Sequence, residues 1–345
     1  MAMLRSITII VAASLASATT CGASCFHMDN LVAFGDSYTD EGRLEYFYTH
    51  RSAPPAGAML PPSNSTASGG YSWGRFVAQK TGAKLYDYAV GGAMCSNAIV
   101  NRTLAPINGP FPSVLEYEVP AFRQDLGFPQ LYPDRRPDNT VYALWIGTND
   151  LGIIGLLGDN QQNGVTLTTF ADCVWTVLDQ LYQSGARHFV LLNQLPLELA
   201  PMYATPGTSG MGNTRYWANR SAYNITEFQF KLAEYTSSAN TLFHYGIPFN
   251  IDVKSRWPGA SFALFDTHSL LRDMMADPSR YFDAPANVKD PFHVCLQGCS
   301  NSPEPLSSFL WYDELHTSER TQQVIASNFV DVVKGTSKYA YYHHA

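Results

Sequence analysis

The chain contains a serine, a histidine and an aspartate at positions that could together perform nucleophilic catalysis. Ser37 follows the apolar run 31–34 near one end, whereas Asp313 and His316 lie three residues apart near the other end. A neutral serine hydroxyl is a poor nucleophile, so an imidazole must accept its proton and a carboxylate must hold that imidazole in the right tautomer. These residues therefore predict a serine hydrolase in which Ser37 is the nucleophile, His316 the general base and Asp313 its orienter.

Two other segments contain hydrogen-bond donors that could stabilise a tetrahedral oxyanion. Gly91 and Gly92 follow a predicted strand at 84–88, and Asn149 follows the apolar run 141–146. Ligands of a parallel sheet bind just beyond the carboxyl ends of its strands, where both segments would lie. A glycine N–H can approach a substrate without a side chain in the way, and the Asn149 amide can donate. The two adjacent glycines leave open which of them is the donor.

Each motif has a simpler structural explanation when it is taken alone. Gly-Asp-Ser is a common turn sequence, and the segment 147–150 could merely end a strand. Asp313 and His316 could belong to the cap of a helix that begins near Thr317. The occurrence of all four motifs in one chain, in order and next to predicted elements, favours catalysis instead.

The chain resembles the SGNH or GDSL hydrolases in these four segments, and it looks like the fungal acetylesterases of carbohydrate esterase family 16 from about residue 31 to about residue 333. The segments that carry the resemblance are Phe34-Gly35-Asp36-Ser37, Gly91-Gly92-Ala93, Gly147-Thr148-Asn149-Asp150 and Asp313-x-x-His316. The resemblance implies an oxyanion hole formed by the Ser37 amide, Gly92 and Asn149. Gly92 is favoured over Gly91 because it directly precedes Ala93, as in the family pattern.

Short β-rich runs alternate with helical patterns along the chain, which predicts a parallel sheet flanked by helices. Together with the resemblance, this pattern predicts an α/β fold, a three-layer α/β/α sandwich of the SGNH hydrolase type with a central, mostly parallel sheet of about five strands. The predicted strands are 31–34, 84–88, 141–146, 188–192 and 248–251, and the clearest predicted helices are 168–184, 226–242 and about 317–333.

The N-terminal segment has the features of a signal peptide. Arg5 precedes the apolar stretch 7–15 and the small residues 16–18, which fits the charged, apolar and cleavage regions of such a segment. We therefore expect a signal peptide at 1–18, a secreted, extracellular protein, and a single catalytic domain at 19–345. This domain would carry long loops at 52–70, 207–212 and 278–305. No later stretch is long and apolar enough to predict a membrane span.

The six cysteines are an even number, as expected for an exported chain with disulfides. Cys295 and Cys299 are the best candidates for a local disulfide, since they lie four residues apart in a loop rich in Pro and Ser. The other four allow three pairings, between which the sequence does not choose; they are Cys21, Cys25, Cys95 and Cys173. The sequence does not predict a zinc site, because it contains no paired Cys-x-x-Cys motif.

The composition also limits the partners of the protein. Charged residues make up 15% of the chain, against about 25% in typical domains, so glycans could help to solvate the surface. The candidate glycosylation sites are Asn64, Asn101, Asn219 and Asn224, each in an Asn-x-Ser/Thr sequon. A net charge of -7 with few basic clusters argues against nucleic acid as a partner. The oligomeric state is left open, with a monomer favoured.

Similarity to the fungal acetylesterases implies hydrolysis of acetyl esters on plant-derived carbohydrate fragments through an acyl-enzyme intermediate. The substrate would be a small-molecule or oligosaccharide ester, and neither a metal nor a cofactor is needed for this chemistry. Trp311 and Tyr312, next to Asp313, could bind a sugar ring or an acyl group. Three alternatives remain: a GDSL lipase acting on longer acyl esters, a non-catalytic carbohydrate-binding protein, and a metal-dependent phosphoesterase with ligands drawn from Asp36, Asp40, Asp150, Asp266, His268 and His316.

Overall fold

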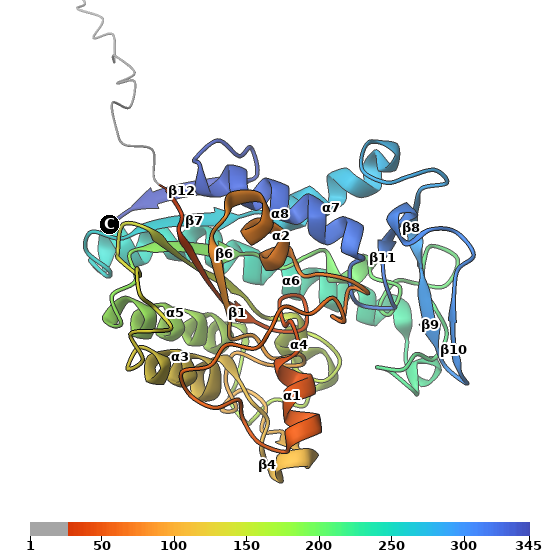
Figure 1. Ribbon diagram of the computed structural model, residues 1–345. Helices are drawn as coiled ribbons and strands as arrows, with labels where there is room; N and C mark the ends of the chain where they lie inside the picture. Colours follow the sequence, from red (N-terminus) through yellow and green to blue (C-terminus); the bar gives the residue numbers. More distant parts are fainter. Residues whose placement is uncertain (1–26) are drawn as a thin grey trace, which may run out of the picture.

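The fold is built around a six-stranded sheet (Figure 1). The computed structural model describes residues 27–345, so the predicted signal peptide at 1–18 and two of the cysteines, Cys21 and Cys25, lie outside the described residues. The strands run in the order β12-β7-β6-β5-β1-β2, and all are parallel except β12. They are β1 (Asn30–Gly35), β2 (Lys84–Asp87), β5 (Thr140–Trp145), β6 (His188–Leu192), β7 (Ser261–Phe265) and β12 (Ala340–His344).

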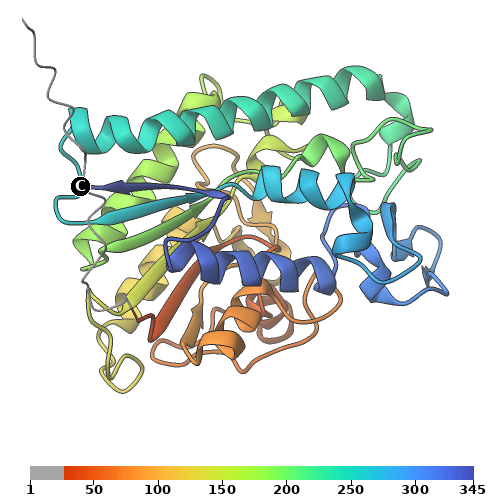
Figure 2. The same ribbon diagram turned by 90° about the horizontal axis from the view of Figure 1, so that it is seen from above.

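Helices cover both faces of this sheet (Figure 2). The pair α2 and α8 lies on one face, and α3, α5 and α6 lie on the other. This arrangement is a three-layer α/β/α sandwich and confirms the predicted fold class. The helices are α1 (Arg43–His50), α2 (Trp73–Thr81), α3 (Val119–Asp125), α4 (Thr148–Leu151), α5 (Leu167–Gln183), α6 (Ile225–Pro248), α7 (Thr267–Ala276) and α8 (Glu319–Val333).

Burial of the central strands explains why the sheet forms at these residues. Every residue of β1 and of β5 is buried, as expected for parallel strands covered on both faces. α8 begins where the Ser318 hydroxyl accepts the N–H of Thr321, and it buries Ile325 and Phe329. The carboxyl ends of β1, β2 and β5 consequently meet at one edge of the sheet, where the first three sequence motifs begin.

One predicted strand is wrong. Residues 248–251 end α6 and enter the π-helical turn Phe249–Val253. The buried residues Phe243, Ile247 and Ile251 recur every four positions, which is the spacing of a helix face and not that of a strand. The strand in this part of the sheet is instead β7, and the antiparallel edge strand β12 was also not predicted.

Short strands outside the central sheet shape the loops. β3 (Thr103–Leu104) pairs with β4 (Gly109–Pro110), β8 (Asn287–Pro291) with β11 (Phe309–Trp311), and β9 (His293–Cys295) with β10 (Cys299–Asn301). The predicted loop 278–305 is therefore partly ordered into strands. The loop 52–70 contains no helix or strand, as predicted.

Two disulfides are present within residues 27–345. Cys295 and Cys299 are bonded to each other across the β9–β10 turn, which confirms the predicted local disulfide. Cys95 is bonded to Cys173, which joins the loop after β2 to α5. Within residues 27–345, no helix has both the length and the apolar character that crossing a bilayer requires.

Candidate active site

Ser37, His316 and Asp313 form a continuous chain of hydrogen bonds beyond the carboxyl end of β1. Gly35 ends that strand at φ +149°, where a Cβ atom would lie 2.2 Å from the Trp145 carbonyl oxygen, so only glycine fits. The turn that follows places Ser37 Oγ 2.7 Å from His316 Nε2. The other ring nitrogen, Nδ1, lies 3.0 Å from each carboxylate oxygen of Asp313. This geometry allows a proton to pass from the serine to the imidazole.

Both carboxylate oxygens of Asp313 accept further hydrogen bonds. Oδ1 accepts the backbone N–H groups of Leu315 and His316 at 2.9 and 2.7 Å. Oδ2 accepts from Arg215 Nη2 at 2.8 Å and from the Tyr216 hydroxyl at 3.2 Å. Burial raises the pKa of the Asp313 carboxyl, but the charge and hydrogen bond of His316 outweigh burial and lower that pKa below its usual value. The carboxyl is therefore ionised near neutral pH.

Opposing influences act on the pKa of His316. Burial lowers this pKa, and the positive charge of Arg215 lowers it further. The charge and hydrogen bond of Asp313, together with the charge of Asp36, raise the pKa and determine the net direction, which is upward. Burial in turn raises the pKa of Asp36 to about 7.

Aromatic rings hold the imidazole of His316 in place. The ring centroids of Tyr38 and Tyr216 each lie 5.6 Å from that of His316. The hydroxyl of the buried Tyr38 donates to the carbonyl of Leu315 at 2.8 Å. These contacts restrict rotation of the imidazole, so its two nitrogens keep facing serine and aspartate.

The two adjacent glycines after β2 differ in what their N–H groups contact. The Gly91 N–H donates to Asp40 Oδ2 at 2.7 Å. The Gly92 N–H has no acceptor among residues 27–345. Gly92 also has a φ of +80°, and a Cβ atom there would lie 3.1 Å from the Phe111 ring. The backbone at Gly92 thus favours glycine and leaves one donor free beside the pocket.

Asn149 comes from α4, the short helix that follows β5. Its side-chain amide donates to the Ala93 carbonyl at 2.9 Å, which leaves its second amide hydrogen free to donate. The next residue, Asp150, accepts the backbone N–H of Cys95 at 3.0 Å. These two bonds fasten the loop after β5 to the loop after β2.

A buried carboxylate, Glu118, joins the loop after β2 to the end of β1. It accepts the backbone N–H of Gly35 at 2.9 Å and that of Val90 at 3.2 Å. Burial raises the pKa of Glu118 well above its usual value. No motif marks this residue in the sequence, because its contacts are with segments 83 and 28 residues away.

A pocket of about 460 Å³ adjoins these residues. Ser37, Gly92, Asn149 and His316 all line it, as do Thr66 of the loop 52–70 and Tyr216. Apolar side chains of Leu44, Ile153 and Met202 complete much of the wall. Such a mixture of apolar walls with a few polar groups is typical of a small-molecule site.

Known proteins with similar sequences are named as ester hydrolases, which agrees with the geometry of this site. Residues 31–329 match the family described as GDSL-like lipase/acylhydrolase. This protein belongs to that family. The chain is 46% identical over 316 residues to an acetylesterase of Hypocrea jecorina, and the match covers 90% of each chain. This GDSL hydrolase is therefore a serine esterase, a carboxylic ester hydrolase.

Two further proteins resemble this GDSL hydrolase more distantly. An acetylesterase of Thermothelomyces thermophilus is 34% identical over 178 residues, which are 50% of this chain and 55% of that protein. Among solved structures, an acetylxylan esterase from Geobacillus stearothermophilus matches with a TM-score of 0.39 and 12% identity, covering 90% of this chain and 96% of that chain.

Five residues predicted from sequence come together in the GDSL hydrolase: Ser37, Gly92, Asn149, Asp313 and His316. All of these except Asp313 line the pocket, and the two predicted substrate-binding aromatics, Trp311 and Tyr312, do not. Trp311 is fully buried, and Tyr312 stacks on His293 with ring centroids 5.2 Å apart. The aromatic residues that do line the pocket are Tyr48, Phe111, Tyr203 and Tyr216.

Sequence reasoning missed Arg215 and Tyr216. Their segment follows the predicted loop 207–212, and 97 to 98 residues separate them from Asp313. Nothing in their local sequence distinguishes this arginine or tyrosine from any other. Arg102, which donates to the Gly92 carbonyl and lies 4.2 Å from the centroid of the Phe111 ring, was missed for the same reason.

The candidate metal ligands do not form one cluster in the described part of the chain. Asp40 accepts backbone N–H groups, among them those of Gly42 and Leu44, and Asp266 caps α7. The one group of His, Cys, Asp and Glu side chains within reach of a common ion in residues 27–345 is His293, Cys295 and Cys299. Both of these cysteines are held in their disulfide.

Proposed function

We propose that this serine esterase is a secreted acetylesterase that removes acetyl groups from plant-derived carbohydrate fragments, with Ser37, His316 and Asp313 as its catalytic triad. The observation that carries the proposal is the Ser37–His316–Asp313 chain of hydrogen bonds beside the 460 Å³ pocket. Substrate binding in this pocket would bring an acyl carbonyl within reach of Ser37 Oγ.

In the proposed mechanism, Ser37 Oγ attacks the acetyl carbonyl carbon while His316 Nε2 takes the hydroxyl proton. The ester bond then breaks, and the sugar oxygen leaves with the proton that His316 returns to it. Water attacks the acetyl-enzyme with the same imidazole as base, and acetate is released as Ser37 recovers its proton. Asp313 stays ionised and stabilises the imidazolium that forms in both steps.

We assign the oxyanion hole to the backbone N–H groups of Ser37 and Gly92 and to the amide of Asn149. The contacts support Gly92 over Gly91, because the Gly91 N–H is already bonded to Asp40. The bond from Asn149 to the Ala93 carbonyl would aim the remaining amide hydrogen before any substrate arrives. Donors that are fixed in advance stabilise developing charge without a cost of reorganisation.

Several observations support the extracellular and carbohydrate parts of the proposal. The chain has a predicted signal peptide at 1–18, two disulfides among residues 27–345, and exposed asparagines at all four predicted sequons, Asn64, Asn101, Asn219 and Asn224. The relative from Hypocrea jecorina is named an acetylesterase. The mature protein would be a single domain, 19–345, and we favour a monomer.

Acyl length tests the substrate assignment. We expect kcat/KM to fall about tenfold or more from acetyl to butyryl esters, with acetate released from acetylated xylo-oligosaccharides. Initial rates on a matched series of 4-nitrophenyl esters and acetate assays on the oligosaccharides would measure this. The apolar wall of Leu44, Ile153 and Met202 favours the lipase alternative. A preference for octanoyl esters with acetylated oligosaccharides left intact would establish that alternative.

The pH dependence tests the role of Arg215. His316 must be neutral to accept the serine proton, so the rate falls as the pH drops through its pKa. Arg215 lowers that pKa, and Arg215→Ala would therefore raise it and move the acidic limb of kcat/KM upward by about half a pH unit to one unit. Arg215→Lys, which keeps the charge, should move the limb less. If the acidic limb of kcat/KM stayed at the same pH in a folded Arg215→Ala protein, Arg215 would not be lowering the pKa of His316.

A further inference from the structure

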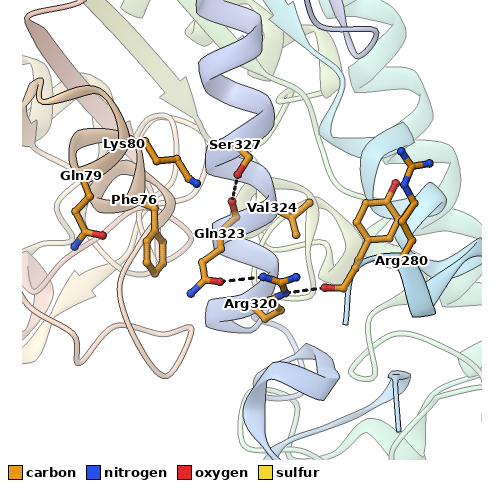
Figure 3. Close-up of a pocket in the computed structure, with 9 residues that line it drawn as sticks. Phe76, Gln79, Lys80, Arg280, Arg320, Gln323, Val324 and Ser327 are labelled. Atoms are coloured by element: carbon orange, nitrogen blue, oxygen red, sulfur yellow. Dashed lines mark hydrogen bonds between the residues drawn. The ribbon is translucent and has the colours of Figure 1, made fainter. Parts of the chain in front are cut away.

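A second hollow lies outside the active site, between α2, α8 and the segment that follows α7 (Figure 3). Its volume is about 330 Å³. α2 contributes one side, α8 the middle, and the end of the 3-10 turn Pro278–Arg280 the other side. We call it the cationic groove, and its nine lining residues are Phe76, Gln79, Lys80, Arg280, Tyr281, Arg320, Gln323, Val324 and Ser327.

The lining of the cationic groove is unusually basic for this protein. Lys80, Arg280 and Arg320 are cations, and none of the nine residues is acidic. The whole chain has 22 Lys and Arg among 345 residues. At that frequency, a set of nine residues would contain on average fewer than one Lys or Arg. Because the net charge is -7, this concentration of positive charge in one concave site is a local feature that attracts anions.

None of the three cations forms a salt bridge with a carboxylate in the described part of the chain. Arg320 donates to neutral oxygens, from Nε to the Tyr281 carbonyl at 2.7 Å and from Nη1 to the Gln323 amide at 3.3 Å (Figure 3). Lys80 and Arg280 form no salt bridge within residues 27–345. Asp273, whose charge acts on Arg280, is itself bonded to Lys338 at 3.0 Å.

The other side chains of the cationic groove fit a sugar. Phe76 and Tyr281 are half-buried aromatic rings that can pack on the C–H face of a pyranose. Gln79, Gln323 and Ser327 offer amide and hydroxyl groups for sugar hydroxyls. The volume lies at the small end of the usual range for ligand sites, about 300 to 1,000 Å³, so one or two sugar rings would fill it.

We propose that the cationic groove binds uronate residues of an acidic oligosaccharide, whose carboxylates are attracted by Lys80 and Arg280 on the two sides of α8 and by Arg320 on α8 itself (Figure 3). A guanidinium can hold a carboxylate through two parallel N–H bonds, and the aromatic and amide groups then contact the ring. This site goes beyond the proposed esterase function and does not depend on it. It is a carbohydrate-binding site separate from the catalytic pocket.

Free phosphate and a lipid surface fit the cationic groove less well. Phosphate sites are typically cradled by backbone N–H groups, but in the first turn of α8 the N–H groups of Glu319 and Thr321 already donate to Ser68 and Ser318. Membrane-surface sites combine cations with exposed apolar side chains. The exposed large apolar residues among the described ones include Phe230, Tyr245 and Phe249 of α6 and its end, and none lines the groove.

The position of the groove suits an extended ligand. Arg320 lies four residues after His316, in the first turn of α8. At about 1.5 Å of rise per residue, the groove extends along α8 for about 10 Å from Arg320 to Ser327. An acidic polysaccharide held here would keep neighbouring sugars near the esterase pocket and raise their effective concentration.

The test is a binding measurement that does not use esterase activity. Isothermal titration of the full-length protein with trigalacturonate, which carries no acetyl group, would be compared with neutral xylotriose. We expect trigalacturonate to bind and xylotriose to bind much more weakly, with trigalacturonate affinity falling as salt rises from roughly 20 to 300 mM. The double variant Lys80→Ala/Arg280→Ala should bind trigalacturonate about tenfold more weakly.

A matched control separates the groove from general charge effects. Lys254→Ala/Lys289→Ala removes the same charge at exposed positions outside the groove and should bind trigalacturonate as the wild type does. All variants should hydrolyse 4-nitrophenyl acetate at the wild-type rate. Equal binding of the acidic and neutral trimers, or wild-type affinity in Lys80→Ala/Arg280→Ala, would overturn the proposal. So would competition by inorganic phosphate at the same concentration, or groove-dependent sedimentation with phosphatidylserine vesicles.

Discussion

Ser37→Ala is expected to lower kcat on acetyl esters by about 10⁵- to 10⁶-fold, the scale seen when a serine nucleophile is removed from a triad. The substitution deletes the oxygen that lies 2.7 Å from His316 Nε2, so no acyl-enzyme can form. Any remaining rate would come from water attacking a carbonyl held in the oxyanion hole. Ser37 is only partly buried, and alanine is smaller, so the fold should persist.

The measurement is steady-state turnover of a 4-nitrophenyl acetate series, with mass spectrometry of rapidly quenched protein to detect an acetyl group on Ser37. Ser237→Ala, on the exposed surface of α6, is a matched control that should keep the wild-type rate. Turnover by folded Ser37→Ala within tenfold of wild type would remove Ser37 from the mechanism. It would return the metal-dependent phosphoesterase to consideration, for which chelator sensitivity is then the next measurement.

The parts of this site that sequence could predict are those in which local pattern and chemistry coincide. Ser37 and Asn149 each follow an apolar run that is visible in the sequence, Gly92 follows a predicted strand, and parallel strands bring such ends to one edge. Asp313 and His316 are close in sequence, so their contact needs no long-range information. The fold class followed from the same alternation of strands and helices.

The parts that sequence could not predict depend on contacts between distant segments. Arg215 reaches Asp313 across 98 residues, and Trp311, a residue predicted to bind substrate, is fully buried. Aromatic composition does not tell which rings face a pocket, because burial and binding favour the same residue types. The strand prediction at 248–251 was wrong for a similar reason, since a short apolar stretch is compatible with a helix end as well as with a strand.

Asp313→Asn is expected to lower kcat by about 10⁴-fold while the protein stays folded. Asp313 Oδ1 accepts two backbone N–H groups, and the amide oxygen of asparagine can replace it there. The amide NH₂ group would then take the place of Oδ2 and face both His316 Nδ1 and Arg215. A donor opposite Nδ1 favours the tautomer with its proton on Nε2, and that nitrogen then cannot accept the proton of Ser37.

The tautomer argument makes Asp313→Asn distinguishable from a folding defect. Near-UV circular dichroism and the melting temperature should show a folded protein, and KM for acetyl esters should change little, because Asp313 does not line the pocket. The loss should therefore lie in kcat. The double variant Arg215→Ala/Asp313→Asn removes the cation that would face the new NH₂ group. We expect its melting temperature to lie above that of Asp313→Asn alone, while kcat stays low. A folded Asp313→Asn protein with kcat within tenfold of wild type would show that another group orients His316, and Asp36, whose charge also acts on that imidazole, would be the next residue to replace.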